Sequence, residues 1–336
     1  MISSVTELEE LLSRPTEADR VAMAALDGDL LILGVGGKMG PTLAVRARRA
    51  APAAKRIMAA ARFSEPGLRE RLEQAGIECF RADILDPVQL AGLPEAANVL
   101  CMFGRKFGSS DDPTLTWAMN VYAPGMVCER YRNSRIVAFS SGNVYGYSHV
   151  ARGGSVETDE PMPVGEYAWT GLGRDRIYDY HSRRNGTPTM LLRLNYAIDL
   201  RYGVLLDIGT RVFERKPVDL SMGAANVIWQ GDANSVALRS FPHATAPATV
   251  LNLTGPETLS VRRIAETIGG HLGVSPEFTG AESTDALLSN AQRCHRLFGY
   301  PTVTPDEMME WTARWIGMGG ATLNKPTHFE ARDGKF

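Results

Sequence analysis

The sequence has few cysteines, and their spacing fits neither a metal site nor a local disulfide. The four cysteines are Cys79, Cys101, Cys128 and Cys294, and no C-x-x-C pair occurs. The six histidines are scattered as well. This pattern predicts buried free thiols in a reducing cytoplasm and no metal site.

The chain also lacks an excess of charge and any long hydrophobic run. Its formal net charge is −2, and no stripe of lysine and arginine supplies the basic surface that nucleic-acid binding needs. No apolar run approaches membrane-spanning length, and the N-terminal residues 1–7 are too polar and acidic for a signal peptide. We therefore expect a cytoplasmic protein that binds neither nucleic acid nor a membrane.

The most informative motif that is present is a glycine-rich stretch directly after an apolar run. Leu30 to Leu33 leads into Gly34-Val35-Gly36-Gly37-Lys38-Met39-Gly40 and then into an alanine-rich segment. This order is typical of a dinucleotide-binding βαβ unit, in which the glycines allow a tight turn and a pyrophosphate sits at the helix N-terminus. A glycine triplet alone more often marks a plain tight turn, so later motifs decide between the two.

Strand-like and helix-like segments alternate as far as residue 196. The segments predicted as strands are Leu30–Leu33, Arg56–Ala61, Ile77–Phe80, Asn98–Phe103, Arg135–Ser140 and Thr189–Leu194. Helical patterns lie between them, for example at 39–50 and 68–75. The alternation predicts an α/β fold with a Rossmann-type, doubly wound parallel sheet and helices on both faces.

The length leaves room for a second, smaller unit. With 336 residues, 44% of them apolar, the chain can bury one large core or two unequal lobes. After residue 196 the alternation loosens, and helical patterns at 261–272 and 306–316 are expected in a C-terminal lobe. The expected parts are a helical leader at 1–28, a Rossmann domain at 29–195 plus about 223–254, a substrate lobe at 196–222 and 255–317, and a tail at 318–336.

Several motifs in a fixed order give the chain a family resemblance. They are Gly34-x-x-Gly37-x-x-Gly40, Arg81 to Asp86, Asn120-Val121, Ile136 to Gly146 and Leu251 to Ser260. From about Asp29 to Ile316 the chain resembles the extended short-chain dehydrogenase/reductase superfamily, in its NAD-dependent epimerase/dehydratase group. The resemblance, with the end of the second strand, implies these cofactor-binding residues: Gly34, Gly37, Lys38, Met39, Gly40, Arg62, Asp83, Phe103, Gly104 and Asn120.

The resemblance also implies an acid–base pair for hydride-transfer chemistry. The family uses a tyrosine as acid or base and a serine or threonine that holds the substrate oxygen. By position these are Tyr167 and Ser141, four residues before Tyr145. Ser140 precedes Ser141 on the predicted strand and is expected to face the other side, in a structural role. Taken alone, Tyr167 also fits an ordinary aromatic residue at a helix start.

One residue of the family pattern is missing. The family places a lysine four residues after the tyrosine, where it binds the nicotinamide ribose and lowers the pKa of the tyrosine by its charge. This chain has Gly171 there. Arg174, two helical turns after Tyr167, and Lys106, in the loop after the fourth strand, are candidates for the substitute. We expect Lys106 to take the catalytic role, against the alternative of a solvated loop charge.

Two further departures concern the substrate. Gly142 and Asn143 stand where sugar-nucleotide 4,6-dehydratases have an acidic pair, so the acid for elimination is missing. Asn226 stands where sugar-nucleotide enzymes have an arginine that clamps the diphosphate, which argues against that substrate class. We expect a small carbohydrate-like substrate: a free sugar, a sugar acid or a related carbonyl compound or polyol. Its candidate contacts are Asn143, Asn195, Arg201, Trp229 and Gln230, of which the last three equally fit core or surface positions.

The end of the second strand bears on the choice of cofactor. NAD enzymes place an acid there for the ribose hydroxyl, whereas an arginine suits the 2′-phosphate of NADP. The sequence reads Ala61-Arg62-Phe63-Ser64, without an acid, and therefore favours NADP. NAD stays open, because the arginine can also stack on an adenine.

Three functions remain after these observations. The first is an NAD(P)-dependent oxidoreductase or epimerase that acts on a small carbohydrate-like substrate through Tyr167 and Ser141. The second is a non-catalytic NADP-binding sensor, which the missing lysine favours and the retained serine and tyrosine oppose. The third is a sugar-nucleotide epimerase. A P-loop nucleotidase is excluded, because Lys38 is followed by Met39 and no G-x-x-x-x-G-K-[ST] motif occurs.

The chain is also expected to form a homodimer. Family members commonly pair through the helices after the fourth and fifth strands, and both helices are apolar enough here. The residues concerned are Leu115, Trp117, Ala118, Val121, Tyr122, Trp169, Leu172, Ile177 and Tyr180. The alternative is that these apolar stripes only cover the sheet.

Overall fold

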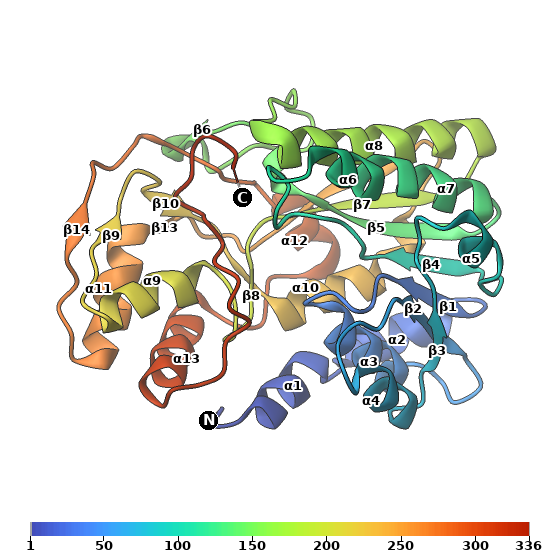
Figure 1. The fold of residues 1–336 in the computed structure, drawn as a ribbon, viewed down its shortest axis with the longest axis horizontal. Coiled ribbons are helices and arrows are strands. Elements are labelled where there is room, and N and C mark those ends of the chain that lie inside the picture. Colours follow the sequence, from blue (N-terminus) through green and yellow to red (C-terminus); the bar gives the residue numbers. More distant parts are fainter. Residues whose placement is uncertain (1, 336) are drawn as a thin grey trace.

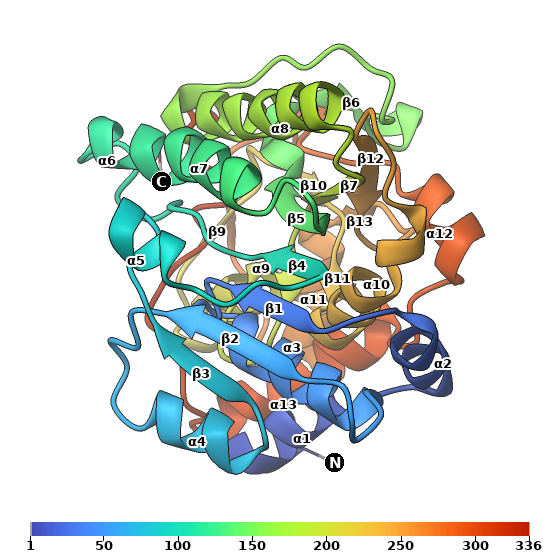
Figure 2. The same cartoon turned by 90° about the vertical axis from the view of Figure 1, so that its right-hand side faces the viewer.

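The centre of the molecule is a sheet of seven parallel strands in the order β12-β7-β5-β4-β1-β2-β3. The computed structural model describes residues 2–335, and Figure 2 shows the strands in this order. Their bounds are β1 Leu30–Leu33, β2 Ile57–Ala61, β3 Glu78–Arg81, β4 Asn98–Cys101, β5 Arg135–Ser141, β7 Thr189–Leu194 and β12 Thr249–Leu253. This is the strand order of a Rossmann-type fold, and the predicted fold class is confirmed.

The predicted strands all form, with small shifts at their ends. β1, β2 and β4 are buried along their whole length, as expected for parallel strands covered on both faces. β4 ends two residues earlier than predicted. The N–H of Met102 still donates to the carbonyl of Leu33, but Phe103 then turns its backbone against Gly34 and leaves the sheet.

Helices cover both faces of the sheet and enclose separate apolar cores. One core contains Leu43 and Leu72, and the core on the other face contains Val127 and Tyr178. The first face carries α3 (Gly40–Ala50), α4 (Leu68–Gln74), α10 (Gln230–Arg239) and α12 (Gln292–Phe298). The second face carries α5 (Pro87–Ala91), α6 (Pro113–Trp117), the π-helical η1 (Ala118–Tyr122), α7 (Ala123–Arg130) and α8 (Gly165–Asn185).

The leader forms two helices, α1 (Val5–Ser13) and α2 (Glu17–Ala25), separated by a short segment that contains Pro15. Asp19 of α2 is fully buried and lies 2.7 Å from the guanidinium of Arg46 in α3. α1 instead contributes Leu8 and Leu12 to the core of the C-terminal lobe. The leader therefore packs against both parts of the molecule.

The C-terminal lobe has its own core, around Ile208, Ile268 and Trp315. Its main helices are α9 (Val204–Phe213), α11 (Val261–Leu272) and α13 (Pro305–Gly317). Short strand pairs complete it and join it to the sheet domain: β6 (Ser148–His149), β8 (Ala197–Ile198), β9 (Val218–Asp219), β10 (Ala224–Ala225), β11 (Ile228–Trp229), β13 (Leu259–Ser260), β14 (Phe278–Thr279) and β15 (Asp285–Ala286).

The tail after α13 forms no helix or strand between residues 318 and 335. In Figure 1 it runs, in red, from the lower end of the C-terminal lobe up between the lobe and the sheet domain, and ends near α8. Residues 1 and 336, the ends of the expected leader and tail, lie outside the described residues. No helix within 2–335 is long and apolar enough to cross a membrane.

Candidate active site

The glycine-rich loop after β1 has the tight geometry that its sequence predicts. Gly34 has a φ of +84°, and a Cβ at this position would lie 2.6 Å from the backbone nitrogen of Phe103. A Cβ at Gly40 would lie 2.2 Å from the carbonyl oxygen of Val35. Both positions therefore require glycine, and the loop delivers the N-terminus of α3 to the carboxyl edge of the sheet.

A cavity of about 310 Å³ opens at this edge, beside the glycine loop. Its wall comes from the glycine loop, the loop after β4, the ends of β5 and β7, helix α8 and the tail. The lining residues are Gly34, Gly37, Lys38, Met39, Gly40, Met102, Phe103, Gly104, Lys106, Phe107, Phe139, Ser140, Tyr167, Arg174, Leu194, Tyr202 and Lys325. The fold thus brings Tyr167 and Lys106, from separate loops and helices, into one cavity with most of the expected cofactor residues.

The two neighbouring serines of β5 differ from expectation in their positions. Ser140, expected to be purely structural, lies in the wall of the cavity, and its buried hydroxyl has no hydrogen-bond partner among the described residues. Ser141 is not part of that wall: its hydroxyl accepts from the N–H of Asn143 and lies 3.0 Å from the Asn143 side-chain oxygen. Alternation along the strand separates the two, as predicted, but it turns Ser140 toward the glycine loop.

Arg174 is held firmly in the cavity wall. Its Nη1 donates to the carbonyl of Phe139 at 3.1 Å, and its Nη2 donates to Oδ1 of Asn120 at 2.5 Å. A Cβ at position 104 would lie 2.4 Å from Nη2, so Gly104 makes room for the guanidinium. Asn120 also bonds both backbone groups of Arg105. Asn120 therefore holds the loop after β4 in place, and it does not itself line the cavity.

Lys38 turns inward from the glycine loop. Its ammonium lies 3.6 Å from the centre of the Tyr202 ring and donates to the carbonyl of Ala197 at 3.3 Å. Burial lowers the pKa of Lys38 to about 7; Asp199 opposes this shift, and the charge of Lys106 adds to it. The accessible surface area of Lys38 is that of a half-buried residue, because part of its side chain is exposed to the open cavity.

Lys106 approaches the same cavity from the loop after β4. Its ammonium donates to the carbonyl of Thr327 in the tail at 3.3 Å. Burial lowers the pKa of Lys106 to about 8, against the opposing charge of Asp207. Burial thus disfavours the charged forms of both lysines. An anionic group bound in the cavity would raise their pKa values and restore their charge.

Gly171, at the position of the missing lysine, is buried on α8. A Cβ there would meet only Cγ1 of Val144, at 3.4 Å, which is ordinary van der Waals contact. The helix thus has room for the first carbon of a side chain.

The two residues expected at the adenine end lie apart from the cavity. Arg62 follows β2 and is exposed. Asp83 accepts from the N–H of Leu85 at 3.0 Å, which shapes the turn after β3. Neither residue lines the cavity, which contains only the glycine-loop and Tyr167 side of the site.

Of the expected substrate residues, Asn143 lines a smaller cavity of about 20 Å³ with Tyr147, Tyr196 and tail residues such as Phe329. Asn195 is buried and donates to Asn226 at 2.8 Å, so both asparagines join β7 to the lobe. Neither lines either cavity.

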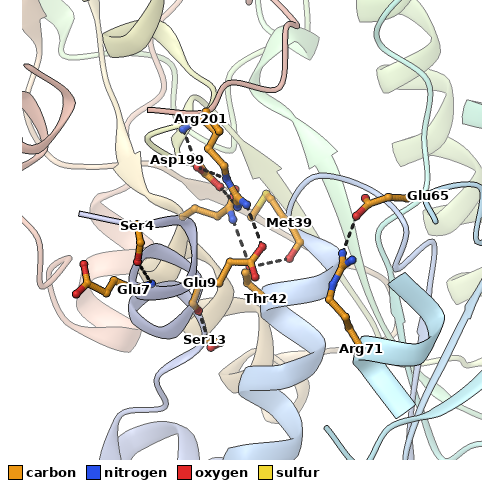
Figure 3. A network of polar contacts seen from close by, with 12 residues as sticks. Ser4, Glu7, Glu9, Ser13, Met39, Thr42, Glu65, Arg71, Asp199 and Arg201 are labelled. Carbon is orange, nitrogen blue, oxygen red and sulfur yellow. Dashed lines mark hydrogen bonds and ion pairs between the residues drawn. The ribbon is translucent and has the colours of Figure 1, made fainter. Parts of the chain in front are cut away.

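Arg201, Trp229 and Gln230 also have positions outside the two cavities. Arg201 pairs with Asp199 at 2.7 Å and with Glu9 of the leader at 3.0 Å, as Figure 3 shows. Trp229 is 2% exposed and packs in the core of the lobe. Gln230 is fully buried and donates to Thr42. These three residues hold the leader, the lobe and α3 together.

Sequence reasoning missed Phe107, Tyr202 and Lys325 as parts of the cavity wall. Phe107 and Tyr202 form an edge-to-face pair with ring centres 6.0 Å apart. Phe107 lies one residue after Lys106, so its place in that loop was a usable signal. Lys325 carries no local signal, because only the path of the tail brings it to the cavity.

The cysteines and acidic residues add no further chemistry to the site. All four cysteines are free, and burial raises the pKa of Cys101 to about 12, which keeps its thiol protonated. Across the described chain, 2–335, no group of three or more histidine, cysteine, aspartate or glutamate side chains is arranged to hold a metal ion.

A dinucleotide fits this site, because the glycine loop, the Ser140 hydroxyl without a partner and the inward-facing lysines can all bind it. With Tyr167 in the same cavity, the site is that of a Rossmann-type nicotinamide-dependent protein. The model of the NAD dependent epimerase/dehydratase family matches residues 30–198. The chain belongs to this family of NAD(P)-dependent enzymes, as the sequence resemblance predicted, and it is an atypical member because of Gly171.

Solved structures resemble most of the chain. The Thermus thermophilus UDP-glucose 4-epimerase in complex with NAD is 17% identical, with a TM-score of 0.71, over 88% of this chain and 100% of that one. The Thermotoga maritima UDP-glucose 4-epimerase with UDP-glucose is 15% identical, with a TM-score of 0.72, over 86% and 98%. The Bacillus cereus UDP-glucuronic acid 4-epimerase in complex with NAD is 17% identical, with a TM-score of 0.69, over 86% and 99%. At these identities the likeness establishes the fold, and a comparison with curated protein sequences finds no match.

Proposed function

We propose that this protein is an NAD(P)-dependent epimerase or oxidoreductase that acts on a carbohydrate-like substrate by hydride transfer. The observation that carries the proposal is that Tyr167 shares one cavity with the glycine loop and with Lys106. When bound, the nicotinamide ring takes up and returns the hydride. Tyr167 removes a proton from the substrate hydroxyl and gives it back. The family resemblance assigns the orientation of the substrate oxygen to Ser141, whose hydroxyl bonds Asn143 outside the wall of this cavity.

Lys106 takes the electrostatic role of the missing lysine in this proposal. It is supported by the place of Lys106 in the wall of the cavity that also contains Tyr167, and by a pKa lowered to about 8. Arg174 is the weaker candidate, because its guanidinium is already bonded to Asn120 and Phe139. Arg174 then serves as a positioning residue for the loop after β4.

A small substrate such as a free sugar or sugar acid is supported by Asn226. The position where sugar-nucleotide enzymes have an arginine holds a buried, neutral side chain that bonds Asn195 and Ser289. The second candidate is a sugar nucleotide, which is supported by the substrates that the titles of similar structures name, UDP-glucose among them.

Substrate screening with the purified protein distinguishes these functions. The reduced-nicotinamide absorbance is followed while free sugars, sugar acids and UDP-glucose are each added with NADP or NAD, and products are checked for epimerisation. Turnover of free sugars alone supports the first candidate, and turnover of UDP-glucose alone supports the second. Tight NADPH binding without any turnover would contradict both and identify a sensor.

We propose NADP as the preferred cofactor. The support is the exposed Arg62 directly after β2, in a sequence that lacks an acid there. A cytoplasmic location belongs to the same proposal and is supported by the four free cysteines.

A homodimer through α6, η1, α7 and α8 is also proposed. Large apolar side chains on these helices are exposed: Trp117 by 42%, Tyr122 by 60%, Trp169 by 52% and Tyr180 by 53%. Light scattering at micromolar concentration tests this, with Tyr122→Glu as the disrupting variant. A monomeric wild-type protein would contradict the dimer.

A further inference from the structure

The tail is fastened to the molecule at points on both sides of the candidate active site. The N–H of Leu323 donates to the carbonyl of Arg201. The N–H and hydroxyl of Thr327 both donate to one oxygen of Asp207, at 2.7 and 2.5 Å. Phe329 is 3% exposed in the core of the lobe.

The end of the tail reaches the sheet domain. The guanidinium of Arg332 donates to the carbonyls of Ser221 and Asp285 and lies 4.3 Å from the centre of the Tyr147 ring. Beyond it, Gly334 packs against Gly165, the first residue of α8, so closely that a Cβ at 165 would lie 2.3 Å from the Gly334 oxygen. The tail thus extends from the lobe, past the cavity whose wall includes Lys325, to the helix that carries Tyr167.

Between these fastening points the tail supplies Lys325 to the cavity wall. The ammonium of Lys325 lies 5.8 Å from the centre of the Phe107 ring, and that of Lys106 lies 5.9 Å from it. Lys38 lies over Tyr202, which contacts Phe107 edge to face. Three lysines from the glycine loop, the loop after β4 and the tail therefore surround one aromatic pair at one cavity.

We propose that residues 323–335 form a strap that closes over the bound dinucleotide, and that Lys325 completes a three-lysine clamp on its diphosphate. This proposal rests on the NAD(P) cofactor of the proposed function. Lys38 belongs to the glycine loop, where the helix N-terminus also favours a diphosphate, so the anion nearest to the clamp is that diphosphate. Thr327 holds Lys106 through its carbonyl and so couples the strap to the second lysine.

The clamp explains why two of the lysines are kept where burial lowers their pKa to about 7 and about 8. A diphosphate between them supplies the opposite charge that Asp199 and Asp207 supply only in part. In this proposal the strap covers the bound dinucleotide, so the dinucleotide enters and leaves only when the strap lifts. We therefore expect slow exchange of the cofactor.

Dissociation constants of full-length variants test the clamp. The probes are NADH, ADP-ribose, which has the diphosphate without nicotinamide, and adenosine, which lacks both. Lys325→Met is expected to weaken NADH and ADP-ribose about tenfold each, the effect of one lost charge-assisted contact, and to leave adenosine unchanged. Lys325→Arg restores binding to within about threefold, and Lys216→Met, which removes an exposed lysine paired with Glu214 outside the tail, has no effect.

Hydrogen exchange of the tail amides is the second readout. NADH is expected to slow exchange across 323–331 in the wild type, and less so in Lys325→Met. Three results would each overturn the strap while leaving the proposed cofactor intact. They are an unchanged NADH affinity of Lys325→Met, an equal weakening of adenosine binding, and tail amide exchange that is the same with and without NADH. Failure of the wild type to bind NADH, NADPH or ADP-ribose would overturn the cofactor proposal and the strap together.

Discussion

The ammonium of Lys38 lies 3.6 Å from the centre of the Tyr202 ring, which joins the glycine loop to the segment after β7. The same ammonium donates to the carbonyl of Ala197. A lysine inside a glycine motif is usually read as a solvated loop charge, whereas here it points into the protein. The site therefore holds a positive charge in the place where a dinucleotide diphosphate approaches.

Lys38→Met is expected to stabilise the cofactor-free protein and to weaken NADH binding. Burial disfavours the charged form of Lys38, so its removal raises the free energy of unfolding by about 1 kcal/mol or more at pH 7. Loss of a cation near the diphosphate weakens NADH about tenfold. Thermal unfolding and a fluorescence titration measure the two effects. Lys216→Met, which removes an exposed lysine paired with Glu214, is the control and should change neither.

The affinity for NADH is expected to fall as the pH rises from about 7 to about 9. The pKa of Lys38 is lowered to about 7 and that of Lys106 to about 8 in the cofactor-free cavity, and a bound diphosphate raises both. Well below pH 7 both lysines are charged before and after binding, so the affinity is constant. Above it, binding must take up protons, which costs affinity. Calorimetry in two buffers of different ionisation enthalpy measures the uptake; no proton uptake at pH 8 would contradict the prediction.

Lys106→Met is expected to lower turnover about tenfold and to move the rising, acid-side limb of its pH profile to higher pH. A cation beside the phenol favours the ionised form by about one pKa unit or more, so its loss reduces the fraction of active base. Tyr167→Phe should reduce turnover about a hundredfold or more. Arg174→Met is the comparison, and thermal unfolding separates its structural effect. If Arg174→Met moves the pH profile and Lys106→Met does not, the assignment of Lys106 is wrong.

Gly171→Lys is expected to raise turnover by returning a cation to helix α8. A Cβ at this position meets only Val144, at 3.4 Å, so the first carbon of the new side chain fits. Gly171→Met is the matched control, because methionine and lysine both favour a helix interior over glycine by roughly 0.5–1 kcal/mol. Both variants should unfold at a higher temperature, and only the lysine should move the pH profile toward neutral pH. Equal kinetics of the two variants would show that the vacant position has no electrostatic role.

Arg62→Ala is expected to weaken NADPH more than NADH, by about 1–3 kcal/mol, the value of a charge-assisted contact to the 2′-phosphate. Titrations with both cofactors give the difference directly. Arg69→Ala, which removes an exposed arginine paired with Glu73, should leave both affinities unchanged. Equal weakening of the two cofactors, or tighter binding of NADH by the wild type, would contradict NADP selection.

The sheet domain was predictable because its signals are local. The apolar run Leu30–Leu33 buries completely as β1, and the glycines that follow it adopt the turn that brings α3 to the sheet. The run at 189–194 forms β7 over the predicted residues. Each signal depends on residues within one strand and one turn, so no knowledge of distant contacts was needed.

The site was only partly predictable, because several side chains bond or pack against distant residues of the chain that the sequence does not reveal. Asn120 was expected at the cofactor, yet Arg105 and Arg174 take up its polar groups. Trp229 was a candidate for the substrate pocket, and the packing of the lobe buries it. Nothing in the local pattern distinguishes these positions from the cavity wall.

By itself the sequence determined the parallel sheet, the glycine loop, the family and the absence of a lysine at Gly171, since each depends on residue type and short spacing. Only the tertiary structure decided that Ser140 faces the cavity and that the ammonium of Lys106 bonds the carbonyl of Thr327, 221 residues away. The tail has little apolar periodicity, so its path is set by a few contacts, such as Thr327 to Asp207 and Phe329 in the lobe core. Contacts between residues so far apart in the chain depend on how the finished domains meet, which no local pattern records.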